Sequence, residues 1–408
     1  MHEVLDASNQ AIRMRYKIET ERENLFDVNM TIAMRVRLKT AVQFDMCKRA
    51  FDRAVSVYEI LNSRVVIEEN GDAFYVDCVS PRSSFTLSEL SFEELINANE
   101  KIRFKIEDGE YIRGYYSHDG LVFLMHHLGG DGKSLLFFIE TFMKILSGES
   151  VPKVPFGRLS VSDLPADSKL PYFYELFIKS WNRKWSKVRR VFTFEDMDRA
   201  FNEFWKTHET QTTVTVYDRD ALDRMKKESK DAGCSLTSYL IAGMLKDMPI
   251  NADVGLAVDG RLDDSRLMGN YATGIHVKYR FDHKKSIGEN AGKFNDLMRP
   301  KLNDPRARYS VLHIVGGMDP TLIDTLSLES SGGYHSKLTS RFREIMSYGK
   351  KKRDLSITNL MKDIIPNKYG KYEIEDIAFV PPVVSYGRNL YGIITVGDRM
   401  TVTHHTYK

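Results

Sequence analysis

The chain has 408 residues, which is too long for a single ordinary core and predicts two domains or lobes. Hydrophobic residues make up 42% of a chain whose formal net charge is +3, so we expect a folded protein without a dedicated nucleic-acid surface. Its three cysteines, Cys47, Cys78 and Cys234, form no CxxC pair and are expected to be reduced thiols. With no secretory-signal pattern near Met1 and no apolar run that could span a bilayer, we expect a cytoplasmic location.

The first 150 residues mix strand and helix patterns. Residues 29–38 alternate apolar and mostly polar side chains, which predicts a half-buried strand, and residues 40–61 have helical spacing. Residues 63–77 predict a hairpin around Asn70-Gly71. A second hairpin is expected from residues 111–117 and 121–125, and it ends at His126-His127 before a helix at about 133–146.

A proline-rich segment, residues 151–171, is the best boundary between two halves, because proline blocks regular ladders and stiffens connections. We therefore expect an N-terminal lobe at 1–170 and a C-terminal lobe at 171–408. Residues 172–205 are rich in aromatic and basic side chains and predict an amphipathic helix that bridges the halves. A basic and aromatic mixture can also bind nucleic acid, but acidic residues are interspersed here.

The second half has the same mixture, so the predicted fold class is α/β of the α+β type. Helices are expected at 218–230 and, after the N-cap Ser235, at 236–248. The predicted strands are residues 211–217, 254–258, 275–281, 355–360, 374–380, 390–396 and 400–406.

The turn after the second hairpin, His126-His127-Leu-Gly-Gly-Asp131-Gly132-Lys133-Ser134, concentrates more chemistry than any other segment. One interpretation is a phosphate loop, because Gly132-Lys133-Ser134 ends like GxxxxGK[ST] and Asp259 could be its magnesium partner. The first glycine of that pattern, however, falls at His127. An imidazole there would crowd the backbone curl that turns amides toward phosphates.

A second interpretation is a metal site built from His126, His127 and Asp131, with His404-His405 adding ligands. Adjacent residues on a strand point to opposite faces, so each histidine pair offers only one ligand to a common site. No second spacing supports zinc, and we expect no metal. A structural histidine pair, satisfied by hydrogen bonds, is a further alternative.

The third interpretation is a general-base turn, and here the chain resembles a known superfamily. His126-His127-Leu-Gly-Gly-Asp131-Gly132 matches the HHxxxDG motif of the condensation-domain and chloramphenicol-acetyltransferase-like acyltransferases. The resemblance continues along the chain. It includes the strand ending near Arg261, Gly269-Asn270, the Ser356–Leu360 segment and two later strands at 377–382 and 391–395. The DFGWG motif of the plant branch is absent, with only Ser385-Tyr386-Gly387 in that region.

The resemblance implies two chloramphenicol-acetyltransferase-like lobes that form a pseudo-dimer, with His127 near the middle of a central tunnel. His127 would remove a proton from an acceptor hydroxyl or amine while that atom attacks a thioester. Asp131 would pair with Arg261 of the other lobe, and Gly132 would let the turn tighten. Further supporting positions are His126, packed beside the site, Gly130, which allows close approach, Asn270 in a structural turn, and Thr358 and Asn359 as possible oxyanion donors.

The resemblance predicts a free-standing acyltransferase that transfers groups other than amino-acyl groups. The co-substrate would be acyl-coenzyme A or an acyl carrier protein thioester, with no permanently bound cofactor. The basic cluster Lys350-Lys351-Lys352-Arg353 could bind coenzyme A phosphates or a carrier protein, although a solvated loop explains it as well. Alternatives are a condensation-like synthase acting on carrier-protein substrates and a non-catalytic docking protein of the same fold. Because the lobes already form a pseudo-dimer, we expect a monomer.

Overall fold

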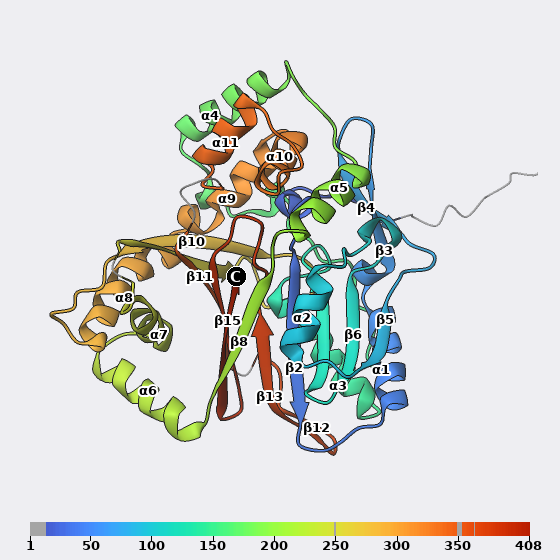
Figure 1. The fold of residues 1–408 in the computed structure, drawn as a ribbon, viewed down its shortest axis with the longest axis vertical. Coiled ribbons are helices and arrows are strands. Elements are labelled where there is room, and N and C mark those ends of the chain that lie inside the picture. The colour runs from blue at the N-terminus through green and yellow to red at the C-terminus, as the bar shows by residue number, and fades with distance from the viewer. Residues whose placement is uncertain (1–13, 249, 349–352, 363) are drawn as a thin grey trace, which may run out of the picture.

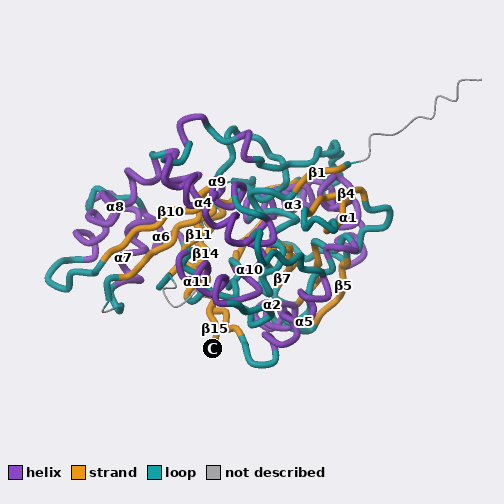
Figure 2. The backbone as a smooth tube through the Cα atoms, turned by 90° about the horizontal axis from the view of Figure 1, so that it is seen from above, coloured by secondary structure: helices purple, strands orange, loops and turns teal. Residues whose placement is uncertain are grey.

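The computed structural model describes residues 14–248, 250–348, 353–362 and 364–408. Two six-stranded mixed sheets lie side by side, with helices around them and a third group of helices at one end (Figure 1). Seen from that end, α6, α7 and α8 lie at one extremity of the molecule and α1 and β5 at the other (Figure 2). Across these described ranges, every helix is too short or too polar to cross a membrane.

The N-terminal sheet has the strand order β12-β13-β2-β7-β6-β5. Its central strand β7 is almost continuously apolar and buried, as expected for a strand covered on both faces. Helix α2 lies in front of this sheet in Figure 1, and α1 and α3 lie behind it. The bounds of these elements are β2 Thr31–Leu38, β5 Ser84–Ser88, β6 Ile112–Ser117, β7 Gly120–His126, β12 Lys368–Tyr369, β13 Tyr372–Val380, α1 Phe44–Val57, α2 Phe92–Glu100 and α3 Gly132–Leu146.

The C-terminal sheet has the order β10-β9-β11-β14-β15-β8, and α6, α7 and α8 pack together against it. A second hydrophobic core lies between these helices and the sheet. The bounds are β8 Thr210–Tyr217, β9 Ala252–Asp259, β10 Ala272–Tyr279, β11 Leu355–Lys362, β14 Asn389–Val396, β15 Arg399–Tyr407, α6 Arg219–Asp231, α7 Leu236–Leu245 and α8 Ile287–Asn303.

The remaining helices gather at the upper end of the view in Figure 1, next to a small sheet of order β1-β4-β3. The predicted single helix over residues 172–205 was wrong, because two helices separated by residues 186–193 occupy it. Thr193 begins the second helix with a capping box to Asp196, which accounts for the restart. The bounds are β1 Arg15–Lys17, β3 Ser63–Ile67, β4 Ala73–Asp77, α4 Tyr172–Trp185, α5 Phe194–Trp205, α9 Pro305–Gly317, α10 Pro320–Ser330 and α11 Lys337–Ile345.

The two large sheets meet through β13. This strand pairs with β2 in the N-terminal sheet and packs against β14 and β15 of the C-terminal sheet. The hydroxyl of Thr401 donates to the carbonyl of Ile377 at 2.6 Å across that contact. The division of the chain at residue 170 stays a prediction, and β12 and β13 cross it, since they belong to the sheet of the first half.

Candidate active site

The histidine turn begins where the central strand of the N-terminal sheet ends. Strand β7 pairs on one side with β2 and on the other with β6. The amide of His126 donates to the Tyr111 carbonyl at 2.9 Å, and the amide of His127 donates to the Met30 carbonyl at 2.8 Å. The backbone of both histidines is therefore held by the neighbouring strands before the chain turns.

The side chain of His126 serves the turn itself. It is 6% exposed, and its Nδ1 accepts a hydrogen bond from the Leu128 amide at 3.1 Å. Burial lowers the pKa of His126 to about 3, and the nearby charges of His127, Arg103 and Arg113 act in the same direction. This imidazole is neutral and committed to the backbone, so it is poorly suited to proton transfer.

His127 has a different environment. Burial lowers the pKa of its imidazole, and the negative charge of Asp131 is the largest opposing effect. Interactions with its own backbone and with the Asn270 side chain also raise the pKa. Asn270 is fixed in turn, since its Oδ1 accepts a hydrogen bond from the Ala272 amide at 3.0 Å. A lowered pKa keeps the imidazole neutral, and hence basic, at neutral pH.

Asp131 joins the histidine turn to the C-terminal half. It is the N-cap of α3, where Oδ1 accepts from the Ser134 amide at 2.8 Å. The same carboxylate forms a two-point ion pair with Arg261, at 2.9 Å from Nη1 to Oδ2 and 3.2 Å from Nη2 to Oδ1. The Tyr271 amide adds a third donor at 3.1 Å. The ion pair between Asp131 and Arg261 that the resemblance implies is thus present and buried.

A second ion pair lies next to the first. Arg261 also contacts Asp259 at 3.0 Å, and Asp259 accepts from Lys133 Nζ at 2.7 Å. We call these four alternating charges, Asp131, Lys133, Asp259 and Arg261, the lobe latch. They connect the start of α3 to the end of β9 and the residue Arg261 that follows it.

Ser134 completes the connection, and the sequence analysis had named it only as the last residue of the phosphate-loop pattern. Its hydroxyl is fully buried, donates to the Gly269 carbonyl at 2.8 Å and accepts from Arg261 Nη2 at 2.9 Å. The weak sequence signal for it was its place three residues after the capping Asp131.

These contacts argue against the phosphate-loop and metal interpretations. Lys133 is neutralised by Asp259, the residue that would have held magnesium. Both carboxylate oxygens of Asp131 already accept hydrogen bonds from Arg261. The Nδ1 atom of His126 is occupied by a backbone amide. Three of the groups that these interpretations need, Lys133, Asp131 and Nδ1 of His126, are therefore engaged within the protein.

Two glycines of the turn lie where neighbouring side chains leave little room for a Cβ atom. A side chain at Gly132 would begin 3.0 Å from Leu360 on β11 and 3.1 Å from the Phe379 ring on β13. Gly130 has φ +155°, and a Cβ there would lie 2.5 Å from the Cβ of Ser134. The turn is therefore packed against strands from the second half of the chain.

The two candidate oxyanion donors, Thr358 and Asn359, differ in what they face. The Asn359 amide donates to Thr237 on α7 at 2.8 Å, and its carbonyl oxygen accepts from the Met361 amide. Thr358 is in register with Gly392 of β14, where a Cβ would lie 2.1 Å from the Phe379 carbonyl. Neighbours in register point to the same face, so Thr358 faces the N-terminal sheet and Asn359 faces α7.

Within the predicted basic cluster, Lys350, Lys351 and Lys352 lie outside the described residues. Arg353 is exposed and passes beside Gly255 of β9, where its Cδ would lie 2.9 Å from an added Cβ. Its charge lowers the pKa of His276 in the same sheet, after the larger effect of burial. The structure therefore places Arg353 near one end of β9 and β11.

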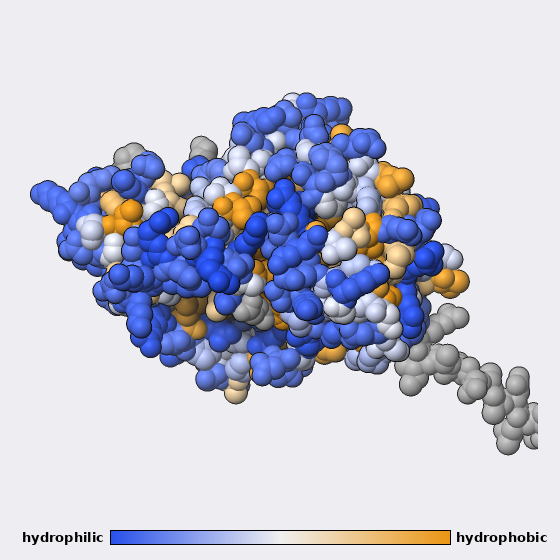
Figure 3. Space-filling view, turned by 90° about the horizontal axis from the view of Figure 1, so that it is seen from below, coloured by the Kyte–Doolittle hydropathy of each residue, from blue (hydrophilic) through white to orange (hydrophobic). Residues whose placement is uncertain are grey.

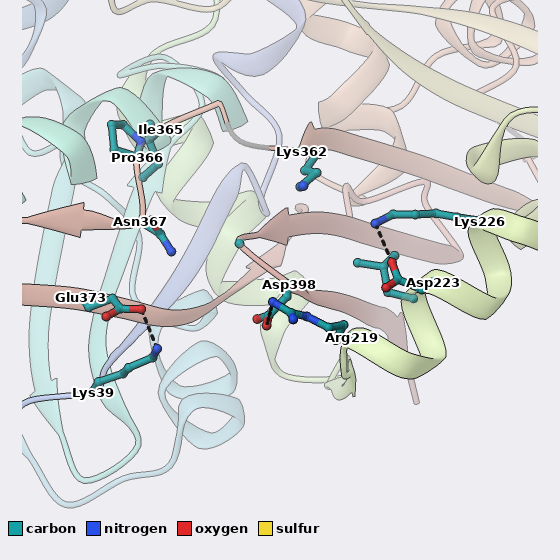
Figure 4. Close-up of a pocket in the computed structure, with 12 residues that line it drawn as sticks. Lys39, Arg219, Asp223, Lys226, Lys362, Ile365, Pro366, Asn367, Glu373 and Asp398 are labelled. Carbon is teal, nitrogen blue, oxygen red and sulfur yellow. Dashed lines mark hydrogen bonds and ion pairs between the residues drawn. The ribbon is translucent and has the colours of Figure 1, made fainter.

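A groove of about 770 Å³ lies elsewhere, between the start of α6, the β12–β13 region and the turn from β14 to β15 (Figure 4). Its charged side chains include three ion pairs: Lys39 with Glu373, Arg219 with Asp398, and Lys226 with Asp223. Seen from below, the molecule is mostly hydrophilic with small hydrophobic areas (Figure 3). Of the predicted site residues that the structure describes, none lines this groove.

Solved structures resemble this fold along nearly its whole length. The first condensation domain of the CDA synthetase superposes with a TM-score of 0.62 at 11% sequence identity, covering 98% of this chain and 91% of that one. The starter condensation domain of rhizomide synthetase, a mutant in complex with C8-CoA and Leu-SNAC, has a TM-score of 0.60 at 10% identity, covering 96% and 89%. Polyketide synthase associated protein 5 from Mycobacterium tuberculosis has a TM-score of 0.57 at 13% identity, covering 97% and 94%.

The chain has the condensation-domain fold. A scan against protein-family models and a search of the curated proteins found no match, so the likeness rests on three-dimensional structure. The predicted fold class and the two-lobed pseudo-dimer are confirmed by these superpositions. The catalytic role of the histidine turn stays a prediction.

Proposed function

We propose that this protein is an acyltransferase that moves an acyl group from a thioester to an alcohol or amine, with His127 as general base. The observation that carries the proposal is the HHxxxDG turn, held at the end of β7 by β2 and β6 and fixed by the buried Asp131–Arg261 ion pair. The condensation-domain fold places this motif in a chain of suitable architecture.

The chemistry follows from the imidazole. His127 takes the proton of the acceptor O–H or N–H while that oxygen or nitrogen attacks the thioester carbonyl carbon. The tetrahedral intermediate then collapses, the carbon–sulfur bond breaks, and the imidazolium returns its proton to the thiolate. Such proton transfer contributes about 100- to 10,000-fold to the rate. Because burial lowers the pKa of His127, the base is unprotonated before the reaction begins.

Thr358 is our choice for the hydroxyl that stabilises the oxyanion. Its side chain faces the N-terminal sheet, whereas the amide of Asn359 is already donated to Thr237. Asp131 and Arg261 are positioning residues, because each satisfies the other and neither is free to exchange protons with substrate. Gly132 has the same supporting role, through its close packing against Leu360.

The proposed acyl donor is a thioester of coenzyme A or of a carrier protein. We also propose a tunnel between the lobes, which donor and acceptor enter from opposite faces. C8-CoA in the rhizomide synthetase domain supports coenzyme A as the first donor to test. The Arg353 side chain, together with the lysines before it, is our candidate for contact with the donor.

The test is thiol release from a panel of acyl-coenzyme A donors with pooled alcohol and amine acceptors. We expect acceptor-dependent release by the wild type and its loss in His127→Ala, with an unchanged melting temperature. His118→Ala, which removes an exposed histidine from the turn between β6 and β7, is the matched control and should keep full activity. Full activity of His127→Ala would exclude the general-base role. Release only from carrier-protein thioesters would instead favour the condensation-like synthase.

A further inference from the structure

Helix α4 presents an unusual surface at the upper end of the molecule in Figure 1. Its inner face carries the adjacent pair Phe177 and Ile178, followed at steps of three or four residues by Trp181 and Trp185. Trp181 lies against Phe342 of α11, with ring centroids 5.1 Å apart, so this face anchors the helix. An outward face that is polar throughout is the ordinary expectation for such a surface helix.

The first half of the outward face is instead apolar. Tyr172 is 68% exposed, Phe173 61% and Leu176 49%. Scattered exposed apolar residues are common, but three large ones within five positions of one helix form a patch. Among the exposed large apolar residues of the described chain, these three are adjacent on one element.

The second half of the same face is basic. Lys179 and Arg183 continue the line of Tyr172 and Leu176 along the helix, at steps of three and four. Lys187 follows the helix, and all three cations are exposed without an acidic partner among the described residues. Lys184 lies over the Trp181 ring at 4.6 Å, and Glu175 is the single acidic residue of α4.

We propose that this face of α4, with Tyr172, Phe173 and Leu176 followed by Lys179, Arg183 and Lys187, binds an anionic lipid surface. Aromatic and aliphatic side chains enter the boundary between headgroups and acyl chains, and long basic side chains keep their charges at the headgroups. Each basic residue near such a surface adds roughly 1 kcal/mol of attraction. This inference does not depend on the acyl-transfer proposal.

The charge pattern favours a membrane over other partners. A nucleic acid would be recognised by aromatic faces interleaved with cations along a groove, whereas here the apolar and basic groups occupy separate halves of a convex helix face. An acidic protein would satisfy the cations but would need its own apolar surface opposite three exposed side chains. A lipid bilayer offers both an anionic layer and an apolar layer behind it.

The experiment is co-sedimentation of the full chain with vesicles of equal parts phosphatidylcholine and phosphatidylglycerol, compared with phosphatidylcholine alone. We expect binding to the anionic vesicles, weakened by salt. The triple variant Tyr172→Ser, Phe173→Ser, Leu176→Ser and the triple variant Lys179→Gln, Arg183→Gln, Lys187→Gln should each bind at least about tenfold more weakly. Because all six side chains are exposed, circular dichroism and the melting temperature should remain at wild-type values.

A matched control removes the same charge elsewhere. Arg49→Gln, Arg53→Gln and Arg64→Gln together change three exposed arginines of the N-terminal lobe and should leave vesicle binding intact. The proposal is overturned if the wild type ignores anionic vesicles, or if the control binds as weakly as the α4 variants. It is also overturned if the α4 variants instead lose binding to single-stranded nucleic acid or to a carrier protein, or lose self-association, while vesicle binding is unchanged.

Discussion

Two groups of charges connect distant parts of this chain, and they differ in almost every physical respect. In the lobe latch, the side chains of Arg261 and Asp131 are 3% and 7% exposed. In the groove of Figure 4, the side chains of Arg219 and Asp398 are 70% and 54% exposed. Exposed pairs are worth little because water screens them and the side chains lose entropy, whereas a buried charge is costly unless its partner remains.

The groove and the latch also show that the larger space does not hold the candidate catalytic residues. The groove is spacious, but its charges neutralise one another at the surface and come from elements without a candidate base. The latch contributes no residue to the lining of that groove. It fixes the turn that carries His127 by holding Asp131 from both the α3 backbone and Arg261. Geometry that is rigid and desolvated is the better indicator of a reactive site.

The largest effect should follow from breaking the latch. Asp131→Ala leaves the buried Arg261 with Asp259 as its remaining acidic partner among the described residues. We therefore expect the free energy of unfolding to fall by about 3–5 kcal/mol. Urea denaturation measures this change. Asp398→Ala removes one partner of an exposed pair as the control and should change stability by less than about 1 kcal/mol. Equal losses in both variants would remove the distinction between latch and groove.

Glu21 sharpens the comparison, because it is a buried acid with no cationic partner among the described residues. It is 6% exposed and accepts a hydrogen bond from the Thr20 hydroxyl at 3.1 Å. Burial raises its pKa from 4.5 to about 7. A carboxyl whose folded-state pKa is raised contributes stability below pH 4.5, and that stability is lost as the pH rises through 7.

We therefore expect Glu21→Gln to increase the free energy of unfolding more at pH 8 than at pH 4.5. The size of the pKa shift sets this difference at about 2–3 kcal/mol. Melting temperatures of wild type and variant at the two pH values measure the difference. Glu373→Gln, on a partly exposed acid of the groove, is the control. If Glu21→Gln has the same effect on stability at both pH values, folding does not raise the pKa of Glu21.

Many individual strands and helices of this architecture could be predicted from the sequence. Apolar alternation, apolar runs and helical spacing predicted β2, β7, α3 and the strands of the second half except β12, because these patterns indicate which residues are buried. The motif at His127 also pointed to Arg261 through resemblance, and the ion pair is present. Strand β5 and helix α2 were not predicted, although Phe85 and Leu87 alternate with polar residues and Ser91 begins α2 with a capping box to Glu94.

Contacts between residues far apart in the sequence could not be predicted from it. Lys133 and Asp259 are 126 residues apart, and nothing local in either segment indicates that one neutralises the other. Strands β12 and β13 belong to the sheet of the opposite half, which depends on packing between lobes. Ser134 was overlooked at this site because its contacts to Gly269 and Arg261 come from the other half of the chain.

The pH dependence of turnover tests whether the latch acts on His127. Burial holds the pKa of His127 below 6.5, so the acidic limb of kcat/KM should lie below pH 6.5. Asp131→Asn removes the charge that raises this pKa and should move the limb to still lower pH. His118→Ala should leave the limb in place. A limb that stays fixed in Asp131→Asn would show that Asp131 acts on the fold alone.

The smallest effects should come from the groove. Arg219→Gln breaks an exposed pair between α6 and the turn from β14 to β15 and should change stability by less than about 0.5 kcal/mol, which urea denaturation can resolve. The same variant should leave thiol release unchanged, because Arg219 shares no contact with the histidine turn. A loss of activity without loss of stability would mean that substrate passes through the groove. In that case the exposed charges, and not only the buried ones, would have to be counted as part of the site.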